Sequence, residues 1–139
     1  MLTKAGQYAV RSTLFLAAHS NKDKRVNVKQ IAKELDVPSP FLAKLLQQLS
    51  KAGLVSSVKG PNGGFYFSEE DKKNTLWDVI KAIDGGHKFE ECFVGRSKCN
   101  SANPCAFHEL AIDFRDKLMH QFQDKTFQTL VSELNSSLF

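Results

Sequence analysis

The sequence predicts a mainly α-helical protein with one small β-hairpin: a winged helix-turn-helix followed by a long C-terminal dimerisation helix. Three observations predict this fold class. Residues 27–52 carry two short amphipathic helices joined by a tight turn, residues 54–67 carry two strand-like segments around a glycine-rich turn, and residues 104–123 carry a long helix with an aromatic stripe. A helix-turn-helix followed directly by a hairpin is the layout of a winged helix, whose second helix enters the major groove of DNA.

A first helix is predicted over residues 3–18, with Tyr8, Leu14 and Phe15 among its apolar positions. It would complete a three-helix core against the helix-turn-helix. Lys4, near its start, is a candidate phosphate contact, although exposed basic residues are usually only solvated. A polar connector, residues 21–25, leads to the next helix.

The helix-turn-helix begins at Asn27, whose side chain can cap a helix while Gln30 reaches back three residues. Apolar residues at every third or fourth position then mark one buried face, and a proline-containing turn ends this helix. Ser39 is the predicted N-cap of the second helix, with Pro40 at its first position, where a missing N–H costs nothing. The second helix ends at Gly53. Its predicted buried stripe consists of Leu42, Leu45, Leu46 and Leu49.

Residues 54–58 and 65–67 have strand composition, and residues 59–64 between them form a turn rich in glycine. They predict the wing, with Lys59 lying along the DNA backbone or in the minor groove. On the second helix, small and polar side chains project away from the leucines and can approach base edges or phosphates. The alternative is that these side chains only solvate a helix surface. The outward-facing residues are Pro40, Ala43, Lys44, Gln47 and Lys51.

The charge of the chain is unevenly distributed. The 139 residues suit one domain of ordinary soluble composition, with 42% hydrophobic and 24% charged residues and a net charge of +4. Residues 1–67 contain ten Lys and Arg against three Asp and Glu, whereas residues 68–139 contain nine against twelve. A basic half that coincides with the winged helix is the pattern expected of a phosphate-facing surface. Neither a membrane span nor a signal peptide is recognisable, so we expect a cytoplasmic protein.

After the wing, residues 68–74 are charged and predicted to form a loop. Thr75 then caps a helix that ends at the pair Gly85 and Gly86. Residues 87–103 show no periodicity, and a structureless connection of this length usually carries function.

The predicted helix over residues 104–123, capped at Asn103 and Pro104, is long and has a narrow apolar stripe. Such a helix packs either against a partner chain, with a homodimer as the default, or against its own domain. Thr126 caps a last short helix. The stripe of the long helix consists of Phe107, Ala111, Phe114, Leu118 and Phe122.

All three cysteines lie in the aperiodic segment and at its end, in the pattern C-x6-C-x5-C, and His108 follows the third cysteine after two residues. Cys105 and His108 are spaced i, i+3 on the first turn of the predicted long helix, so they face the same way. Thiolates at a helix N-terminus also gain from the helix dipole. Together with Cys92 and Cys99 on the flexible loop, this pair is a candidate metal site.

Four interpretations of these residues compete. A disulfide conflicts with an odd cysteine count in a cytosolic chain. Structural zinc suits three cysteines and a histidine, but the sequence has no close C-x2–4-C pair. A catalytic Cys105–His108 pair lacks an orienting third group and a substrate cleft. An iron–sulfur cluster accepts wider spacings and mixed ligation, and the spacing modestly favours it over zinc.

Several stretches resemble the Rrf2 family of bacterial winged-helix transcription regulators. They are residues 2–10 (LTKAGQYAV), residues 28–32 (VKQIA) and, most specifically, residues 53–65 (GLVSSVKGPNGGF). The three-cysteine loop of the family matches Cys92, Cys99 and Cys105, so the likeness covers nearly the whole chain. It is most similar to the IscR-like members that bind a cluster.

This resemblance implies a homodimer that crosses its long helices, binds a palindromic operator in double-stranded DNA and carries an iron–sulfur cluster in the cysteine loop. In IscR-like members, a histidine beyond the third cysteine, where His108 stands, helps to hold a two-iron cluster; a four-iron cluster is the second choice. Nitric-oxide sensors of the family use an aspartate of the first helix, but no aspartate precedes Asp23 here. The implied metal ligands are Cys92, Cys99, Cys105 and His108.

Two features depart from the usual pattern of the family. The six residues between Cys92 and Cys99 are one more than in many cluster-binding members, and Pro38 and Pro40 are uncommon at the start of the second helix. They bear on the cluster type and on the operator sequence. Family members without cysteines show that DNA binding does not require the cluster.

We divide the chain into a winged helix-turn-helix DNA-binding domain (1–84), a cluster-binding cysteine loop (85–108), and dimerisation and C-terminal helices (104–139). The predicted function is a DNA-binding transcription regulator, not an enzyme, whose operator affinity responds to an iron–sulfur cluster. The alternative is a winged-helix repressor that uses zinc or reactive thiols without such a cluster. The predicted DNA-binding residues are Thr3, Lys4, Val28, Ser39, Pro40, Ala43, Lys44, Gln47, Lys59, Gly60, Pro61, Asn62 and Gly63.

Overall fold

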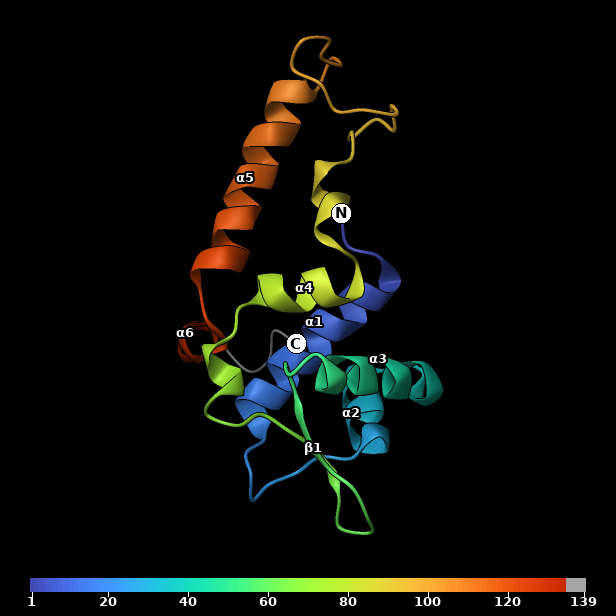
Figure 1. The fold of residues 1–139 in the computed structure, drawn as a ribbon, viewed down its shortest axis with the longest axis vertical. Coiled ribbons are helices and arrows are strands. Elements are labelled where there is room, and N and C mark those ends of the chain that lie inside the picture. The colour runs from blue at the N-terminus through green and yellow to red at the C-terminus, as the bar shows by residue number, and fades with distance from the viewer. Residues whose placement is uncertain (135–139) are drawn as a thin grey trace.

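A computed structural model describes residues 1–134, which are mainly helical with one two-stranded antiparallel sheet. Figure 1 shows a winged-helix body from which the long helix α5 rises beside η2, with the cysteine-containing loop joining the two at the far end. The predicted fold class is confirmed. The elements are α1 (Lys4–His19), α2 (Val28–Leu35), α3 (Ser39–Lys51), β1 (Ser56–Val58), β2 (Gly64–Tyr66), η1 (Asp71–Lys73), α4 (Leu76–Ile83), η2 (Gly86–Glu90), α5 (His108–Asp124) and α6 (Phe127–Glu133).

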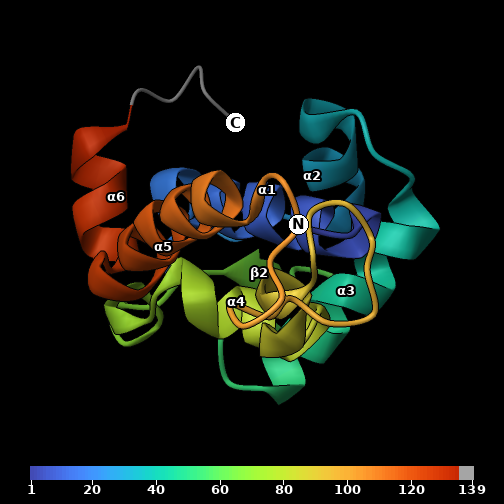
Figure 2. The same ribbon diagram turned by 90° about the horizontal axis from the view of Figure 1, so that it is seen from above.

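The hydrophobic core lies between α1, α2 and α3 and extends to α4, α6 and the end of the hairpin. Seen from above, α5 and α6 lie on one side of the body and α2 and α3 on the other (Figure 2). The four leucines predicted as the inner stripe of α3 are all buried. Because each buried leucine contributes roughly 1.5–3 kcal/mol, this stripe fixes which face of α3 turns outward.

Local capping sets the start of two helices as predicted. The Asn27 side chain accepts from the Gln30 N–H at 2.9 Å, while the Asn27 N–H donates to the Gln30 side chain at 3.1 Å. Thr75 and Asp78 form a second capping box at the start of α4. Each box satisfies two backbone donors that the helix itself leaves unpaired.

The start of α3 differs by one residue from the prediction. Ser39 is the first helical residue and not the N-cap, because the carbonyl oxygen of Pro38 already accepts from the Leu42 N–H at 3.0 Å. In the described part of the chain, no side chain caps this end. Pro40 is therefore the second helical residue, where its missing N–H still costs nothing.

The wing is the hairpin of β1 and β2, in which Ser57 faces Phe65 across the ladder. β1 is shorter than predicted, because Leu54 and Val55 turn into the core. β2 has the predicted length but begins one residue earlier, at Gly64.

The base of the wing is held from two sides. The Val26 N–H donates to the Phe65 carbonyl oxygen at 2.9 Å, and the Phe65 N–H donates to the Val26 carbonyl oxygen at 2.8 Å. The Phe67 N–H donates to the Ser20 hydroxyl at 3.0 Å. Only the tip, residues 59–63, extends beyond these anchors.

Residues 68–74, predicted as a charged loop, contain the short helix η1 and a buried carboxylate, Asp71. Asp71 accepts from the Ser56 hydroxyl at 2.6 Å and from the Ser68 N–H at 2.9 Å. These two bonds tie β1 to the segment that precedes α4.

Helix α5 begins at His108, four residues later than predicted. Residues 105–108 form a turn in which the His108 N–H donates to the Cys105 carbonyl oxygen at 3.1 Å. The prediction that Cys105 lies in the first helical turn is therefore wrong. A proline such as Pro104 is tolerated at a helix start but does not oblige a helix to follow.

Helix α6 begins after Thr126, as predicted. Phe127 is fully buried, and its ring lies edge-on to that of Phe67 with 4.9 Å between the ring centres. Because Phe67 directly follows β2, α6 fastens the C-terminal end of α5 to the base of the wing. Residues 135–139 of the predicted C-terminal region lie outside the described residues.

Candidate functional site

The outward face of α3 carries side chains predicted to contact DNA. Pro40, Lys44 and Gln47 are exposed and Ala43 is half-buried, all on the side opposite the leucines. A groove of about 640 Å³ separates this face from the wing. Its lining includes Val28, Gln47, Ser50, Lys51, Ser57 and Lys59.

The wing tip presents exposed backbone and the side chain of Lys59. Residues 59–62 are exposed, and a Cβ at Gly63 would lie 2.1 Å from the Val58 carbonyl oxygen, so the turn requires glycine there. Arg25 reaches the tip from the connector and donates to the Asn62 carbonyl oxygen at 3.3 Å. Sequence reasoning missed Arg25, although the basic character of residues 21–25 was its signal.

Thr3 and Lys4 lie at the start of α1, where Lys4 is exposed and Thr3 is half-buried. The Thr3 hydroxyl accepts from the Gly6 N–H at 3.0 Å and donates to Oδ1 of Asp84. The Thr3 N–H donates to Oδ2 of the same carboxylate at 2.9 Å. The Thr3 side chain is thus engaged within the protein, and its contact with DNA stays a prediction.

Phe41 is a second residue that sequence reasoning missed on this surface. Its side chain is 42% exposed on α3, and its ring stands edge-on to Tyr8 of α1 at 5.7 Å. The sequence could have indicated its exposure, because Phe41 lies outside the buried leucine stripe of α3.

In the cysteine loop, Cys99 and His108 are close together. The Cys99 sulfur lies 3.5 Å from Nδ1 of His108. Two ligands of one tetrahedral ion, with a metal–sulfur bond near 2.3 Å and a metal–nitrogen bond near 2.0 Å, are separated by about 3.5 Å. His108 is only 7% exposed, and within residues 1–134 its Nε2 has no hydrogen-bond partner.

Cys92 is buried. The backbone N–H of Arg96 is the main cause that holds the pKa of Cys92 below its ordinary value, against the opposing effect of burial. The Val94 N–H, the Cys105 side chain and the Arg96 charge lower the pKa further. These groups favour the thiolate, which is the form that binds metals.

The predicted ligands thus fall into two pairs of different kinds: Cys99 and His108 are in contact, whereas Cys105 is linked to Cys92 by its effect on the pKa of that thiol. Within residues 1–134, no three Cys, His, Asp or Glu side chains are gathered closely enough to form a metal site. A shared centre would require the two pairs to approach one another. Both pairs belong to the same loop and the start of α5.

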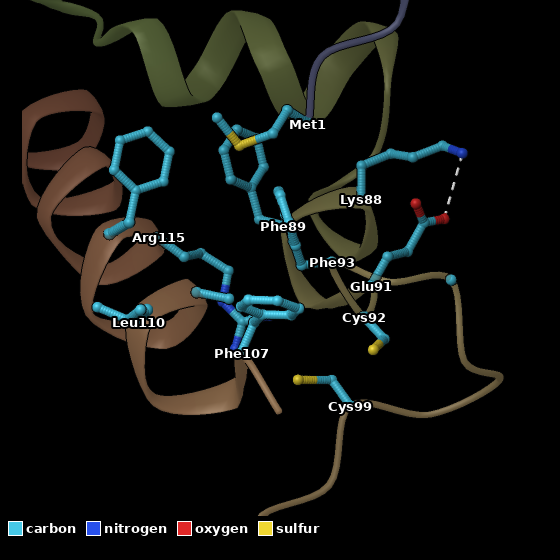
Figure 3. A pocket seen from close by; sticks show the side chains of 13 residues that line it. Met1, Lys88, Phe89, Glu91, Cys92, Phe93, Cys99, Phe107, Leu110 and Arg115 are labelled. Carbon is cyan, nitrogen blue, oxygen red and sulfur yellow. Dashed lines mark hydrogen bonds and ion pairs between the residues drawn. The ribbon is translucent and has the colours of Figure 1, made fainter. Parts of the chain in front are cut away.

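Beside the cysteines lies a pocket of about 630 Å³ between the loop, η2 and α5 (Figure 3). Cys92 and Cys99 project into it, and Phe107 and Arg115 line it from α5. Four apolar side chains that line or adjoin the pocket are exposed. They are Phe93 (74%), Phe107 (51%), Leu110 (74%) and Phe114 (57%).

The family of the chain follows from a match over almost its whole length. The model of the Rrf2 family, described as iron-dependent transcriptional regulators, matches residues 2–133. The chain belongs to the Rrf2 family.

Two relatives of this Rrf2 chain agree with that result. An HTH-type transcriptional regulator of Aquifex aeolicus is 37% identical over 135 residues, which cover 96% of this chain and 92% of the relative. The HTH-type transcriptional regulator IscR of Vibrio atlanticus is 33% identical over 132 residues, which cover 95% and 75%. The Rrf2 chain is thus a transcription regulator and not an enzyme.

Two solved structures share its fold. CymR, the global cysteine regulator of B. subtilis, has a TM-score of 0.74 at 24% identity, with 97% of this chain and 98% of CymR covered. IscR of T. potens has a TM-score of 0.69 at 21% identity, with 100% and 91% covered. Among residues 1–134 of the Rrf2 chain, no helix is long and apolar enough to cross a membrane.

The donors of this Rrf2 regulator suit a soft metal centre in chemistry and in part in geometry. Thiolates and imidazole bind zinc and iron–sulfur clusters. The distance of 3.5 Å between the Cys99 sulfur and Nδ1 of His108 fits two ligands of one ion. Within residues 1–134, no third donor is gathered with this pair.

Proposed function

We propose that this regulator binds a palindromic operator as a homodimer in the bacterial cytoplasm, and that an iron–sulfur cluster in the cysteine loop controls its operator affinity. The observation that carries the cluster is the ligand-like pair of Cys99 and His108, in which the cysteine sulfur lies 3.5 Å from Nδ1 of the imidazole. This is the distance expected between two ligands of one tetrahedral ion.

The DNA-binding surface comprises α3, the groove and the wing tip. Lys44 and Gln47 would reach base edges or phosphates, while Lys59 and Arg25 would follow the backbone. The excess of positive charge in residues 1–67 supports this surface as the one that faces the DNA phosphates, because residues 68–139 carry an excess of negative charge. The predicted members Val28, Ser39, Pro40 and Ala43 would provide a close approach without charge.

A second copy of the chain would cover the apolar face of α5. The C-terminal part of the predicted stripe packs within the chain, since the ring centres of Phe122 and Phe89 are 5.8 Å apart. The N-terminal part, with Phe107 and Phe114, is exposed. The apolar stripe of α5 would therefore pack against its own domain at the C-terminal end and against a partner chain at the N-terminal end. Two-fold symmetry would then match the symmetry of a palindromic operator.

The cluster would be held by Cys92, Cys99, Cys105 and His108. When bound, it supplies a redox-active centre that oxygen, nitric oxide or iron supply can alter. The chain itself provides thiolates: backbone N–H groups of Val94 and Arg96 stabilise the charge on Cys92. A two-iron cluster is favoured by the resemblance to IscR-like members, in which a histidine joins three cysteines, with a four-iron cluster as the second choice.

The alternative function is zinc-stabilised or thiol-based regulation on the same winged helix. The 3.5 Å pair equally suits tetrahedral zinc, and the lowered pKa of Cys92 suits thiol chemistry. Both alternatives retain the DNA-binding surface.

Anaerobic purification with an absorption spectrum and analysis of iron, sulfide and zinc tests these functions. We expect a coloured protein with iron and acid-labile sulfide, and loss of the colour in Cys99→Ala but not in Ser97→Ala. Zinc without iron, or no metal, would favour the alternatives. Protein without iron whose affinity for a palindromic duplex equals that for a scrambled one would refute the proposal as a whole.

A further inference from the structure

We infer that Asp84 is a positioning residue that transmits the state of the cysteine loop to the helix-turn-helix through the N-terminus of α1. This inference rests on the proposed function, because it concerns how the loop changes operator affinity. The juxtaposition that carries it joins two segments 81 residues apart in the sequence.

The Asp84 carboxylate closes over the start of α1 with both oxygens. Oδ2 accepts from the Thr3 N–H at 2.9 Å, and Oδ1 accepts from the Thr3 hydroxyl. Gly6 leaves the space for it: a Cβ on Gly6 would lie 2.2 Å from Oδ2. The first turn of α1 contains no acidic residue, so Asp84 supplies the negative charge that a helix N-terminus favours.

Asp84 also directly precedes the cysteine loop in the chain. It is the C-cap of α4, and the next residue, Gly85, has a φ of +77° before η2 begins. Phe89 of η2 is buried, with its ring 5.6 Å from Trp77 of α4. Cys92 follows three residues later, so a displacement of Cys92 passes through a short, packed segment to Asp84.

From the start of α1, the path continues to both helices of the helix-turn-helix. Tyr8 stands edge-on to Phe41 of α3 at 5.7 Å. Arg11 donates to the carbonyl oxygen of Leu35, the last residue of α2, at 2.6 Å. A shift of α1 therefore moves the recognition helix and the turn before it as one unit.

The test measures the ratio of operator affinities before and after anaerobic loading with ferrous iron and sulfide. We expect a ratio of about 5–150 in the wild type, the usual range for linked sites. Asp84→Asn keeps the shape of the side chain but removes its charge, and we expect its ratio to fall toward one. Glu69→Gln, which removes one charge from an exposed side chain of the Glu69–Lys72 pair, should retain the wild-type ratio.

Gly6→Ala attacks the same contact from the opposite side and serves where Asp84→Asn fails to fold. Alanine favours a helix over glycine, so a lowered ratio in Gly6→Ala reports the displaced carboxylate and not a weaker helix. Hydrogen exchange of the Gly6 amide in metal-free protein is a readout independent of loading, and we expect it to accelerate in Asp84→Asn.

The outcomes separate the two proposals. A wild-type ratio of one refutes control by the cysteine loop, and the transmission role falls with it. A normal wild-type ratio that persists in Asp84→Asn and Gly6→Ala overturns only the role of Asp84 and leaves the proposed function standing.

Discussion

Replacing His108 by leucine is expected to make the metal-free protein more stable while abolishing the capacity of the loop to hold metal. The imidazole is 7% exposed, and its Nε2 has no partner within residues 1–134. Among the described residues, the one polar contact of the imidazole is with the Cys99 sulfur at 3.5 Å, and a thiol is a weak hydrogen-bonding group. Leucine has a similar volume and leaves no buried polar atom unpaired.

The size of the effect follows from the cost of a buried, unpaired polar group, about 1–3 kcal/mol. For a domain of this length, 1 kcal/mol corresponds to about 4 °C in Tm. We therefore expect Tm of the metal-free protein to rise by roughly 4–12 °C in His108→Leu.

The assay is thermal unfolding in the presence of a chelator, followed by anaerobic loading with iron and sulfide and an absorption spectrum. His120→Leu is the control, because His120 is exposed on α5 and pairs only at the surface with Asp124. It should change stability by less than about 1 kcal/mol and leave loading intact. A destabilised His108→Leu, or one that still develops full colour, would refute the reasoning.

Three further outcomes are expected. Phe127→Ala should cost about 3–5 kcal/mol in urea unfolding, because its fully buried ring packs against Phe67; a cost below about 1 kcal/mol would argue against α6 as an anchor. Lys59→Ala should lower the slope of log affinity against log salt by about one, whereas exposed Lys98→Ala should not. In metal-free protein, the lowered pKa of Cys92 should shift its alkylation profile to lower pH than in urea. Its thiolate stabilises the fold above the unfolded pKa, and this contribution is lost as pH falls through the folded pKa. Identical profiles would contradict this.

The sequence predicted best the features that depend on neighbouring residues. The capping box of Asn27 and Gln30 and the leucine stripe of α3 each rest on spacings of three or four, which the chain displays directly. The start of α5 at His108 was missed because a turn over residues 105–108 competes with the helix, and an Asn-Pro pair is compatible with either.

Contacts between distant segments left no trace in the sequence. The bonds between Thr3 and Asp84 depend on how α4 ends beside α1, and no local spacing encodes that placement. The pairing of Cys99 with His108 was open for the same reason, since a loop of unknown path separates them. The residue types of the metal site were predictable, but their grouping into two pairs was not.

The two backbone hydrogen bonds between Val26 and Phe65 affect the entropy that the wing loses when the protein binds DNA. Because its base is hydrogen-bonded to the connector, the hairpin has its bound shape before it meets DNA. Only a few residues at its tip then lose conformational freedom on binding. Each side chain immobilised on binding costs roughly 0.5–1.5 kcal/mol, so a pre-shaped wing keeps that entropic loss small. Genomic scanning by such a regulator would then be limited by diffusion and charge rather than by loop ordering.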